Sequence, residues 1–228
     1  MLSTLRGALK DGLSRVPVDF VERWLALSIL RNRFPTVRQT PAFPRREDLW
    51  RSVFAPLENR EITVLEFGVF RGESIRTFSE LNTHPQSRFY GFDSFEGLPE
   101  DWTRTLPRSS FDVEGQIPQI ADPRVQFIKG WFQNTLPDFL SGRSELKNLV
   151  VHYDADIYSA TVFAMTMIDR FKEPYLAIFD EFTGHETRAL WNYCQMTGAT
   201  VEFSGFAGDA RFPMQVACTI TPARTYEP

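Results

Sequence analysis

The sequence predicts an α/β protein built on a Rossmann-like, doubly wound sheet, mostly parallel with an antiparallel hairpin at its C-terminal end. From residue 62 onward, short apolar runs alternate with segments of helical periodicity, which is typical of a parallel sheet covered by helices. The first run ends in a carboxylate, Glu66, and the chain then turns through Gly68 and Gly72 into a helical segment. Glycines let a backbone approach a ligand, and a helix N-terminus offers free N–H groups, so this corner is typical of nucleotide binding.

The elements follow in order along the chain. The expected parallel strands are residues 62–66, 88–92, 125–128, 148–153 and 175–180, each a short run of mainly β-branched or aromatic residues. The expected helices, which show apolar positions at helical spacing, are residues 73–82, 133–141, 160–171 and 185–197. The last two runs, VEFSGF and QVACTIT, have no helical segment between them, which favours an antiparallel hairpin at the sheet edge.

Residues 1–60 are interpreted as a helical lead-in or cap, and residues 61–228 as the main domain. Residues 18–34 carry apolar positions at helical spacing, and three prolines then interrupt the pattern before a second helical segment at 46–57. The apolar helix at 18–30 is placed either to pack against a second subunit or to cover the active site. A homo-oligomer is therefore possible.

Composition excludes several classes of function. With 228 residues, 43% hydrophobic and 24% charged, the chain suits one globular domain. A net charge of −4 and a pI near 5.5 argue against nucleic acid as a partner. No apolar run is long enough for a membrane span, and the N-terminus lacks the features of a signal peptide. Cys194 and Cys218 lack metal-ligand spacing, so we expect reduced thiols in a cytoplasmic protein and no zinc.

Acidic residues stand at the ends of four of the five expected parallel strands. They are Glu66, Asp93, Asp154 with Asp156, and Asp180 with Glu181. Any one of them is more often a helix N-cap than a ligand. Together they favour a site, because ligands bind outside the carboxyl ends of such strands and like charges gathered there need a partner.

The first corner favours a particular cofactor. Its spacing is E-x-G-x-x-x-G, which lacks the third glycine of the dinucleotide fingerprint G-x-G-x-x-G. A carboxylate before the glycines suits a cationic ligand such as the ammonium group of S-adenosylmethionine (SAM). Asp93 is placed to accept the ribose hydroxyls, although NAD would satisfy the same geometry. Gly130 and Trp131 follow the third strand, where Trp131 either stacks on the adenine or fills the core.

The carboxylates Asp154, Asp180 and Glu181 form a candidate Mg²⁺ site, because hard oxygen ligands suit that ion. A bound metal lowers the pKa of a hydroxyl and fixes its direction, as attack on a methyl sulfonium requires. The alternative is that Asp180 caps the next helix and Glu181 is solvated.

The general base remains open between two candidates, Asp154 first and His185 second. His152 points to the same face of its strand as Asp154, but a lone buried His is more often a core residue than a base. Residues 97–124 are rich in Pro, Gly and acidic side chains and are a candidate lid; residues 204–214 are a second candidate substrate loop.

Five blocks in this order resemble the macrocin O-methyltransferase (TylF-type) family of class I SAM-dependent methyltransferases. They are LEFGVFRGES, FYGFDSFEGLPEDW, KGWFQNTLPDFL, HYDADIYSAT and FDEF, spanning roughly residues 64–182. The resemblance implies that the first block holds the methionine end of SAM and that Asp93 binds the ribose. Asp154 and Asp156 match the family's D-x-D pair, whereas the D-D pair is here Asp180 and Glu181. His152 stands where an apolar residue is usual.

The sequence thus predicts a SAM-dependent O-methyltransferase that acts, with Mg²⁺, on a hydroxyl of a sugar, glycoside or similar small polar acceptor. The expected cofactor-binding residues are Glu66, Phe67, Gly68, Gly72, Ser74, Asp93, Ser94, Gly130, Trp131 and Asp154. Three alternatives remain: a metal-independent N-methyltransferase, a SAM-binding scaffold without turnover, and a nicotinamide-dependent oxidoreductase. Sensitivity to a chelator would argue against the N-methyltransferase, and the missing third glycine disfavours the oxidoreductase.

Overall fold

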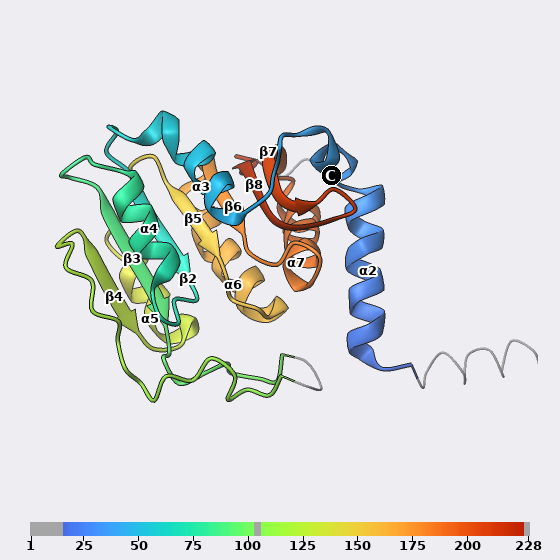
Figure 1. Ribbon diagram of the computed structural model, residues 1–228, viewed down its shortest axis with the longest axis horizontal. Coiled ribbons are helices and arrows are strands. Elements are labelled where there is room, and N and C mark those ends of the chain that lie inside the picture. Colours follow the sequence, from blue (N-terminus) through green and yellow to red (C-terminus); the bar gives the residue numbers. More distant parts are fainter. Residues whose placement is uncertain (1–15, 103–105, 226–228) are drawn as a thin grey trace, which may run out of the picture.

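The computed structural model describes residues 16–102 and 106–225, and its central element is one eight-stranded sheet (Figure 1). The strand order is β1-β7-β8-β6-β5-β2-β3-β4. The strands are β1 (Ala42–Phe43), β2 (Thr63–Phe67), β3 (Arg88–Asp93), β4 (Val125–Lys129), β5 (Val150–Tyr153), β6 (Tyr175–Phe179), β7 (Thr200–Asp209) and β8 (Phe212–Thr221).

The helices of the described residues cover both faces of this sheet. They are α2 (Val18–Asn32), α3 (Arg46–Phe54), α4 (Glu73–Leu81), α5 (Phe132–Leu140), α6 (Tyr158–Ile168) and α7 (His185–Thr197). Short 3-10 turns follow three of them, at Pro35–Gln39, Ala55–Leu57 and Asp169–Phe171. Within the described residues, no helix is both long and apolar enough to cross a membrane.

Strand β2 lies at the centre and determines where a ligand can bind. All five of its residues are buried, since helices cover both sides, and it pairs in parallel with β3 on one side and β5 on the other. The chain builds outward from β2 through β3 to β4, then crosses back to form β5 and β6 on the opposite side. The order therefore reverses between β2 and β5, and in open α/β sheets ligands bind beside such a reversal, outside the carboxyl ends of the strands.

Two apolar layers hold the helices to the sheet. On one face, α3 and α4 bury residues such as Trp50, Phe54 and Phe78 against β2, β3 and β5. On the other face, α5, α6 and α7 bury a larger cluster, and α2 contributes Ile29 and Leu30 to it. Aromatic rings make up much of this packing, which explains the 21 phenylalanines of the sequence.

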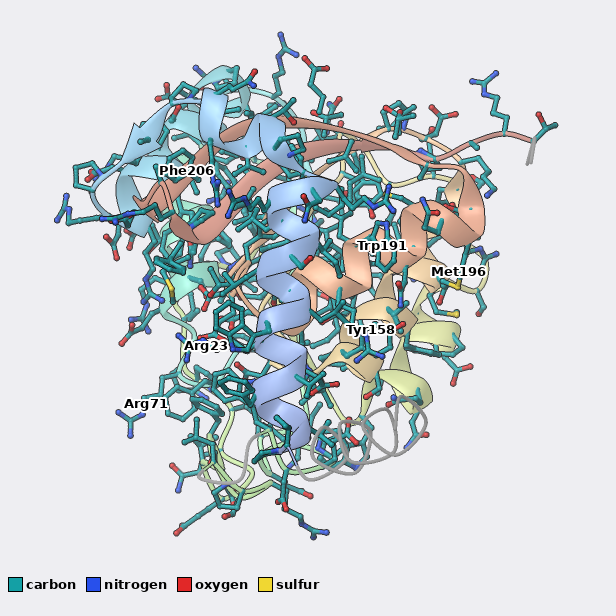
Figure 2. The ribbon with its side chains drawn as sticks, turned by 90° about the vertical axis from the view of Figure 1, so that its right-hand side faces the viewer. Arg23, Arg71, Tyr158, Trp191, Met196 and Phe206 are labelled. Atoms are coloured by element: carbon teal, nitrogen blue, oxygen red, sulfur yellow. The ribbon has the colours of Figure 1, made fainter. Side chains whose placement is uncertain are left out.

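The N-terminal segment is integrated with the sheet. Helix α2 packs against α7, as Figure 2 shows, and β1 pairs in parallel with β7 at the sheet edge. The chain therefore crosses from the α2 side of the molecule to the sheet edge before α3 begins. Residues 1–15 of the expected lead-in lie outside the described residues.

The predicted fold class is confirmed: the sheet is mostly parallel, and β8 pairs antiparallel with both β6 and β7. The predicted strands and helices match the observed ones to within about three residues at each end. One expectation is wrong. Residues 204–214 are not an irregular loop, because β7 continues to Asp209 and β8 begins at Phe212, leaving only a tight two-residue turn. The alternating burial of β8 continues through this segment, and glycines at 205 and 208 obscure the strand pattern in the sequence.

Candidate active site

The loop after β2 is locked against the end of β5. Gly68 has φ +94°, and a Cβ built on it would lie 1.8 Å from the backbone oxygen of Asp154. Only glycine fits here, because both the backbone conformation and the space exclude a side chain. The amide of Asp154 also donates a hydrogen bond to the carbonyl of Phe67 (2.9 Å). The first glycine of the sequence motif therefore joins the two strands at the point where the strand order reverses.

Asp93, at the end of β3, holds the same loop in place. Its Oδ2 accepts hydrogen bonds from the amides of Val69 (2.7 Å) and Phe70 (2.8 Å), and its Oδ1 accepts one from Phe95 (2.7 Å). Phe70 and Phe95 both have positive φ, of 52° and 58°, so these charge-assisted bonds offset backbone strain. Each carboxylate oxygen accepts about two hydrogen bonds, which leaves Oδ1 one further acceptor position.

Glu66 is buried beneath this loop rather than open to solvent. Its Oε1 accepts hydrogen bonds from the hydroxyl of Ser74 and from Nδ1 of His152 (2.9 Å). Its Oε2 is buried and has no hydrogen-bond partner among the described residues. A buried carboxylate oxygen without a partner is costly, so Glu66 offers a strong acceptor position to a cationic or hydrogen-bonding ligand.

Four carboxylates gather at the ends of β5 and β6. Burial raises the pKa of Asp154 well above its usual value, and the nearby carboxylates of Asp180 and Asp156 add to this. Burial, with Glu181 and Asp180, raises the pKa of Asp156 to about 8. Burial and Asp180 also raise the pKa of Glu181, against an opposing effect of Arg23. Such a cluster favours the binding of a cation.

Glu186 is a fifth carboxylate at this edge, and sequence reasoning missed it. It is buried in the first turn of α7, where its Oε2 accepts a hydrogen bond from the amide of Glu181 (3.0 Å). Burial and the neighbouring Asp180 raise its pKa well above the usual value. The available signal is the position of Glu186 within the first turn of a helix that follows an acidic strand end, where a carboxylate commonly accepts backbone N–H groups.

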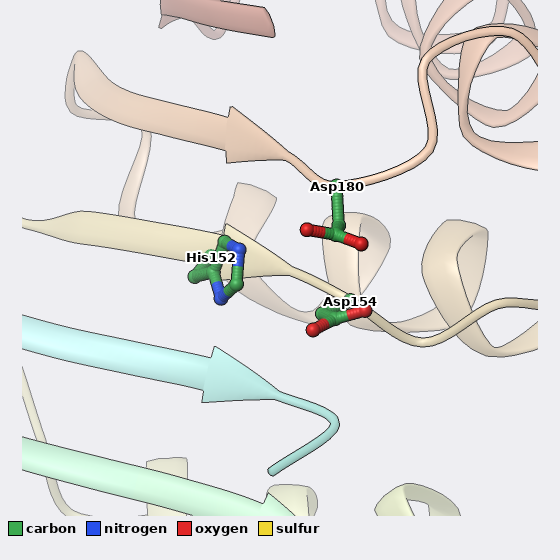
Figure 3. Close-up of side chains that lie close together, drawn as sticks. All are labelled: His152, Asp154 and Asp180. Atoms are coloured by element: carbon green, nitrogen blue, oxygen red, sulfur yellow. The ribbon is translucent and has the colours of Figure 1, made fainter. Parts of the chain in front are cut away.

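Three side chains come closest to forming a metal site. One potential ligand atom from each of His152, Asp154 and Asp180 lies within 4.8 Å of the others (Figure 3). His152 lies in β5 and Asp154 directly after it, and their ligand atoms lie close together, as their spacing predicts; Asp180 follows the paired strand β6. Glu181, expected as a ligand from the sequence, does not belong to this group of three.

Asp180 is oriented by a buried relay that sequence reasoning did not identify. The indole N–H of Trp50 donates to Oε1 of Gln215 (2.9 Å), and Nε2 of Gln215 donates to Oδ1 of Asp180. An indole nitrogen can only donate, so this bond fixes the amide orientation of Gln215. Its signal in the sequence is a polar residue at an inward position of the otherwise apolar strand β8.

A cavity of about 260 Å³ lies over these strand ends. The sequence-predicted residues that line it are Gly68, Ser74, Asp93, Ser94, Trp131, Asp154, Asp180 and Glu181. Arg46, from α3, also lines it, with its guanidinium 3.9 Å from Oδ1 of Asp180. The structure thus brings most of the predicted site residues to one cavity. Those that do not line it are Glu66, Phe67, Gly72, Gly130 and His185.

His185 does not line the cavity and has structural partners on neighbouring helices. Its Nδ1 accepts a hydrogen bond from the amide of Tyr158 (3.2 Å), and its Nε2 lies 3.7 Å from a carboxylate oxygen of Glu22 on α2. Arg188 pairs with the same glutamate at 2.7 Å. These contacts link α2, α6 and α7, so His185 is better placed to join helices than to receive a proton in the cavity.

Aromatic rings from the segment between β3 and β4 form the outer wall of the cavity. Trp102 and Phe111 line it with ring centroids 5.8 Å apart, and Phe70 contacts Phe111 edge-on at 5.6 Å. Trp131 and Phe132 line the cavity at the start of α5. The described part of the segment runs below the strand ends in Figure 1. The cavity therefore combines an aromatic wall with an acidic floor, which is formed by Asp154, Asp156, Asp180 and Glu181.

Comparisons with known proteins agree with this geometry. The family described as Macrocin-O-methyltransferase (TylF) matches residues 57–199. The 8-demethyl-8-(2,3-dimethoxy-alpha-L-rhamnosyl)-tetracenomycin-C 4'-O-methyltransferase of Streptomyces olivaceus is 27% identical, over 72% of this chain and 69% of that protein. The solved structure of the calicheamicin methyltransferase CalS11 matches with a TM-score of 0.57 and 17% identity, over 92% of this chain and 89% of that one. A structure of CalS11 described as an apo TDP-rhamnose 3'-O-methyltransferase matches with a TM-score of 0.53 and 18% identity, over 92% and 91% of the two chains.

Proposed function

The chain belongs to the macrocin O-methyltransferase (TylF) family of SAM-dependent enzymes, and from this premise we propose that it methylates a hydroxyl of a sugar, glycoside or similar small polar acceptor. One observation carries the proposal. The nucleotide-binding corner, the ribose-type carboxylate and the acidic strand ends line a single cavity beside the reversal of strand order. A methyl donor and a polar acceptor bound there would meet above β2 and β5.

We assign the cofactor end of the cavity to the corner after β2. The acceptor position left on Oδ1 of Asp93 suits a ribose hydroxyl. Three hydrogen bonds from backbone N–H groups hold the Asp93 carboxylate rigid. Glu66 lies beneath the loop and does not line the cavity, but its Oε2 is buried without a partner; it would accept the ammonium group of SAM if the loop after β2 moves aside, because a buried acceptor gains most from a charged donor. Trp131 in the wall offers a face on which adenine can stack.

We assign the acceptor to the space between the acidic floor and the aromatic wall. Sugars present both hydroxyls, which carboxylates can bind, and apolar ring faces, which Trp102 and Phe111 can contact. The names of the tetracenomycin and calicheamicin relatives, both of which refer to rhamnose-containing molecules, support an acceptor of this class.

We further propose that a divalent cation binds at the acidic floor, where Asp154 and Asp180 supply oxygen ligands and Glu181 lies nearby in the same cavity. The residues fit a cation, since burial, and then the neighbouring carboxylates, raise the pKa of Asp154 and Asp156. When bound, the ion would lower the pKa of a coordinated hydroxyl and orient it.

The acceptor proton must then pass to a carboxylate as the oxygen attacks the methyl group in line with sulfur. Asp154 remains the first candidate for this base, and Asp156 joins it because it lines the cavity and is held at φ +60°. Asp adopts left-handed backbone more readily than most residues with a Cβ, but such a conformation at the end of a strand still commonly marks a functional position. The products are a methyl ether and S-adenosylhomocysteine.

The outer face of α2 supports the proposal of a homo-oligomer. Val18, Phe20, Val21 and Trp24 are each about half exposed or more, while the opposite side of the helix packs on α7. An exposed apolar stripe of this kind is typical of a protein interface. The two free cysteines fit the proposed cytoplasmic location.

The proposal is tested by measuring S-adenosylhomocysteine release from SAM with a panel of sugars and glycosides, in parallel with amines of similar size. Turnover with a hydroxyl acceptor, lost when that hydroxyl is replaced by hydrogen, is the expected result. Turnover with amines alone, unaffected by EDTA, would contradict O-methylation and favour the N-methyltransferase.

A further inference from the structure

We propose that His152 is a direct metal ligand, so that the site holds a first-row transition metal through one imidazole nitrogen and the carboxylates of Asp154 and Asp180. This inference rests on the proposed function only for the position of the site, and it names a ligand and a metal class that differ from the all-oxygen Mg²⁺ site expected from the sequence. The geometry of His152 carries it.

The two nitrogens of His152 have different surroundings. Nδ1 lies 2.9 Å from Oε1 of Glu66, whereas Nε2 is buried and has no hydrogen-bond partner within the described part of the chain. A carboxylate accepts hydrogen bonds, so the contact with Glu66 places a proton on Nδ1 and leaves Nε2 as the nitrogen whose lone pair can bind a metal. The whole side chain is 0% exposed, and the bare nitrogen is therefore not satisfied by bulk water.

The unpartnered nitrogen faces the two carboxylates. Figure 3 shows one ring nitrogen of His152 turned toward Asp180 and the other turned toward β2, the strand that carries Glu66. The edges of Trp50 and Phe78 pack against the imidazole, with ring centroids 6.1 and 5.1 Å away, and hold the ring in this orientation. Lone pairs from three side chains thus converge on one small space.

The dimensions allow an ion to bind with only small movements. Metal–ligand bonds of about 2.1 Å place neighbouring ligand atoms about 3–4 Å apart. The ligand atoms of His152, Asp154 and Asp180 all lie within 4.8 Å of one another, so slight side-chain rotations would close the site. Asp154 and Asp180 line the cavity, which gives an ion a path to the buried nitrogen.

Two of the three ligands have the supporting contacts that metal sites require. A ligating His commonly donates its second N–H to a carboxylate, which is the arrangement of His152 with Glu66. Asp180 is held through Oδ1 by Gln215, itself fixed by Trp50, which leaves Oδ2 for an ion. An imidazole ligand suits Co²⁺ or Zn²⁺ better than Mg²⁺, which prefers oxygen, and a Zn²⁺ site of this kind would depart from the expectation of no zinc drawn from the cysteines.

The test uses the metal alone, without SAM or acceptor. Mn²⁺ is bound to the purified full-length wild-type protein, and pulsed electron paramagnetic resonance is used to look for coupling to a nitrogen nucleus. Affinities for Co²⁺ and Mg²⁺ are measured by calorimetry on the wild type, on His152→Leu and on the matched control His84→Leu. His84 lies between α4 and β3, where its Nδ1 accepts a hydrogen bond from the amide of Gln86.

We expect nitrogen coupling in the wild type and in His84→Leu, and its loss in His152→Leu. We also expect Co²⁺ to bind the wild type more tightly than Mg²⁺, and His152→Leu to weaken Co²⁺ binding at least about 10-fold while changing Mg²⁺ binding by much less. The wild-type spectrum keeps the test valid even if His152→Leu folds poorly.

A wild-type spectrum without nitrogen coupling, or tighter binding of Mg²⁺ than of Co²⁺, would overturn the inference. A separate titration with SAM distinguishes the two proposals. Failure to bind SAM would remove the proposed function while the metal spectrum still decides the role of His152.

Discussion

Substitution of Gly68 by alanine is expected to destabilise the protein more than the same substitution at any ordinary left-handed glycine. Gly142 is the matched control, since its φ of +76° is similar to the +94° of Gly68 but a Cβ there would meet nothing within 4 Å. At Gly68 the added Cβ lies 1.8 Å from the carbonyl oxygen of Asp154, so the ends of β2 and β5 must move apart to admit it. Both variants share the backbone strain, and only Gly68→Ala adds this collision.

The magnitudes follow from these two effects. Left-handed backbone at a residue with a Cβ costs about 1–2 kcal/mol, and this is the whole expected loss of stability for Gly142→Ala. A forced shift of packed elements adds about 1–3 kcal/mol, so Gly68→Ala should lose about 2–5 kcal/mol. Gly68→Ala should also weaken SAM binding, because the displaced loop carries the amides that hold Asp93.

The assay is urea unfolding followed by tryptophan fluorescence, with the free energy of unfolding extrapolated to water and the slope compared between variants. Calorimetry with SAM on the same samples gives the second readout. Equal destabilisation of the two variants would refute this reasoning, since it would mean that the contact between Gly68 and Asp154 does not restrict the junction of β2 and β5.

Three further predictions concern other parts of the molecule. Asp180→Ala should lower turnover at least about 100-fold, because misplacing the acceptor is this costly, and should leave SAM binding intact. Asp209 is an exposed carboxylate on β7, and Asp209→Ala should leave both turnover and SAM binding unchanged. Normal turnover in Asp180→Ala would exclude the role assigned to Asp180. Tyr153→Phe should cost about 1–2 kcal/mol in urea unfolding by removing the buried hydroxyl pair with Tyr175 (3.1 Å), and a stability equal to wild type would contradict this. Burial raises the pKa of the half-buried Cys194 thiol to about 12, so it stays protonated at pH 8 and should react with a thiol reagent more slowly in the native protein than after unfolding; equal labelling rates would contradict this.

The fold is predictable from the sequence because its signals are local. Each of the five parallel strands expected from the sequence is a short run that ends in, or is closely followed by, an acidic residue or a glycine. These runs alone predict that Gly68, Asp93, Asp154 and Asp180 lie at one edge of the sheet. Because ligands of such sheets bind outside the carboxyl ends of the strands, that edge is also the predicted binding site. The acidic and glycine residues of the cavity lining therefore follow from spacing alone, whereas most of its other lining residues do not.

What sequence reasoning missed depends on contacts between distant segments. The pairing of His152 with Glu66 joins residues 86 positions apart, and the relay from Trp50 through Gln215 to Asp180 joins α3 to β8 and the end of β6. No spacing pattern encodes such contacts, because they depend on how strands align across the sheet. For the same reason the sequence favours a core role for His152, although its unpartnered nitrogen faces the acidic floor.

The central claim, that this cavity binds SAM for methyl transfer, is tested most directly by calorimetric titration with SAM, S-adenosylhomocysteine and NAD, each with and without EDTA. We predict micromolar binding of both SAM and S-adenosylhomocysteine, no binding of NAD, and nucleoside binding that persists in EDTA because the proposed metal lies at the acceptor. Binding of NAD with no response to SAM would contradict the roles assigned to Glu66 and Asp93 and, with them, the proposed reaction.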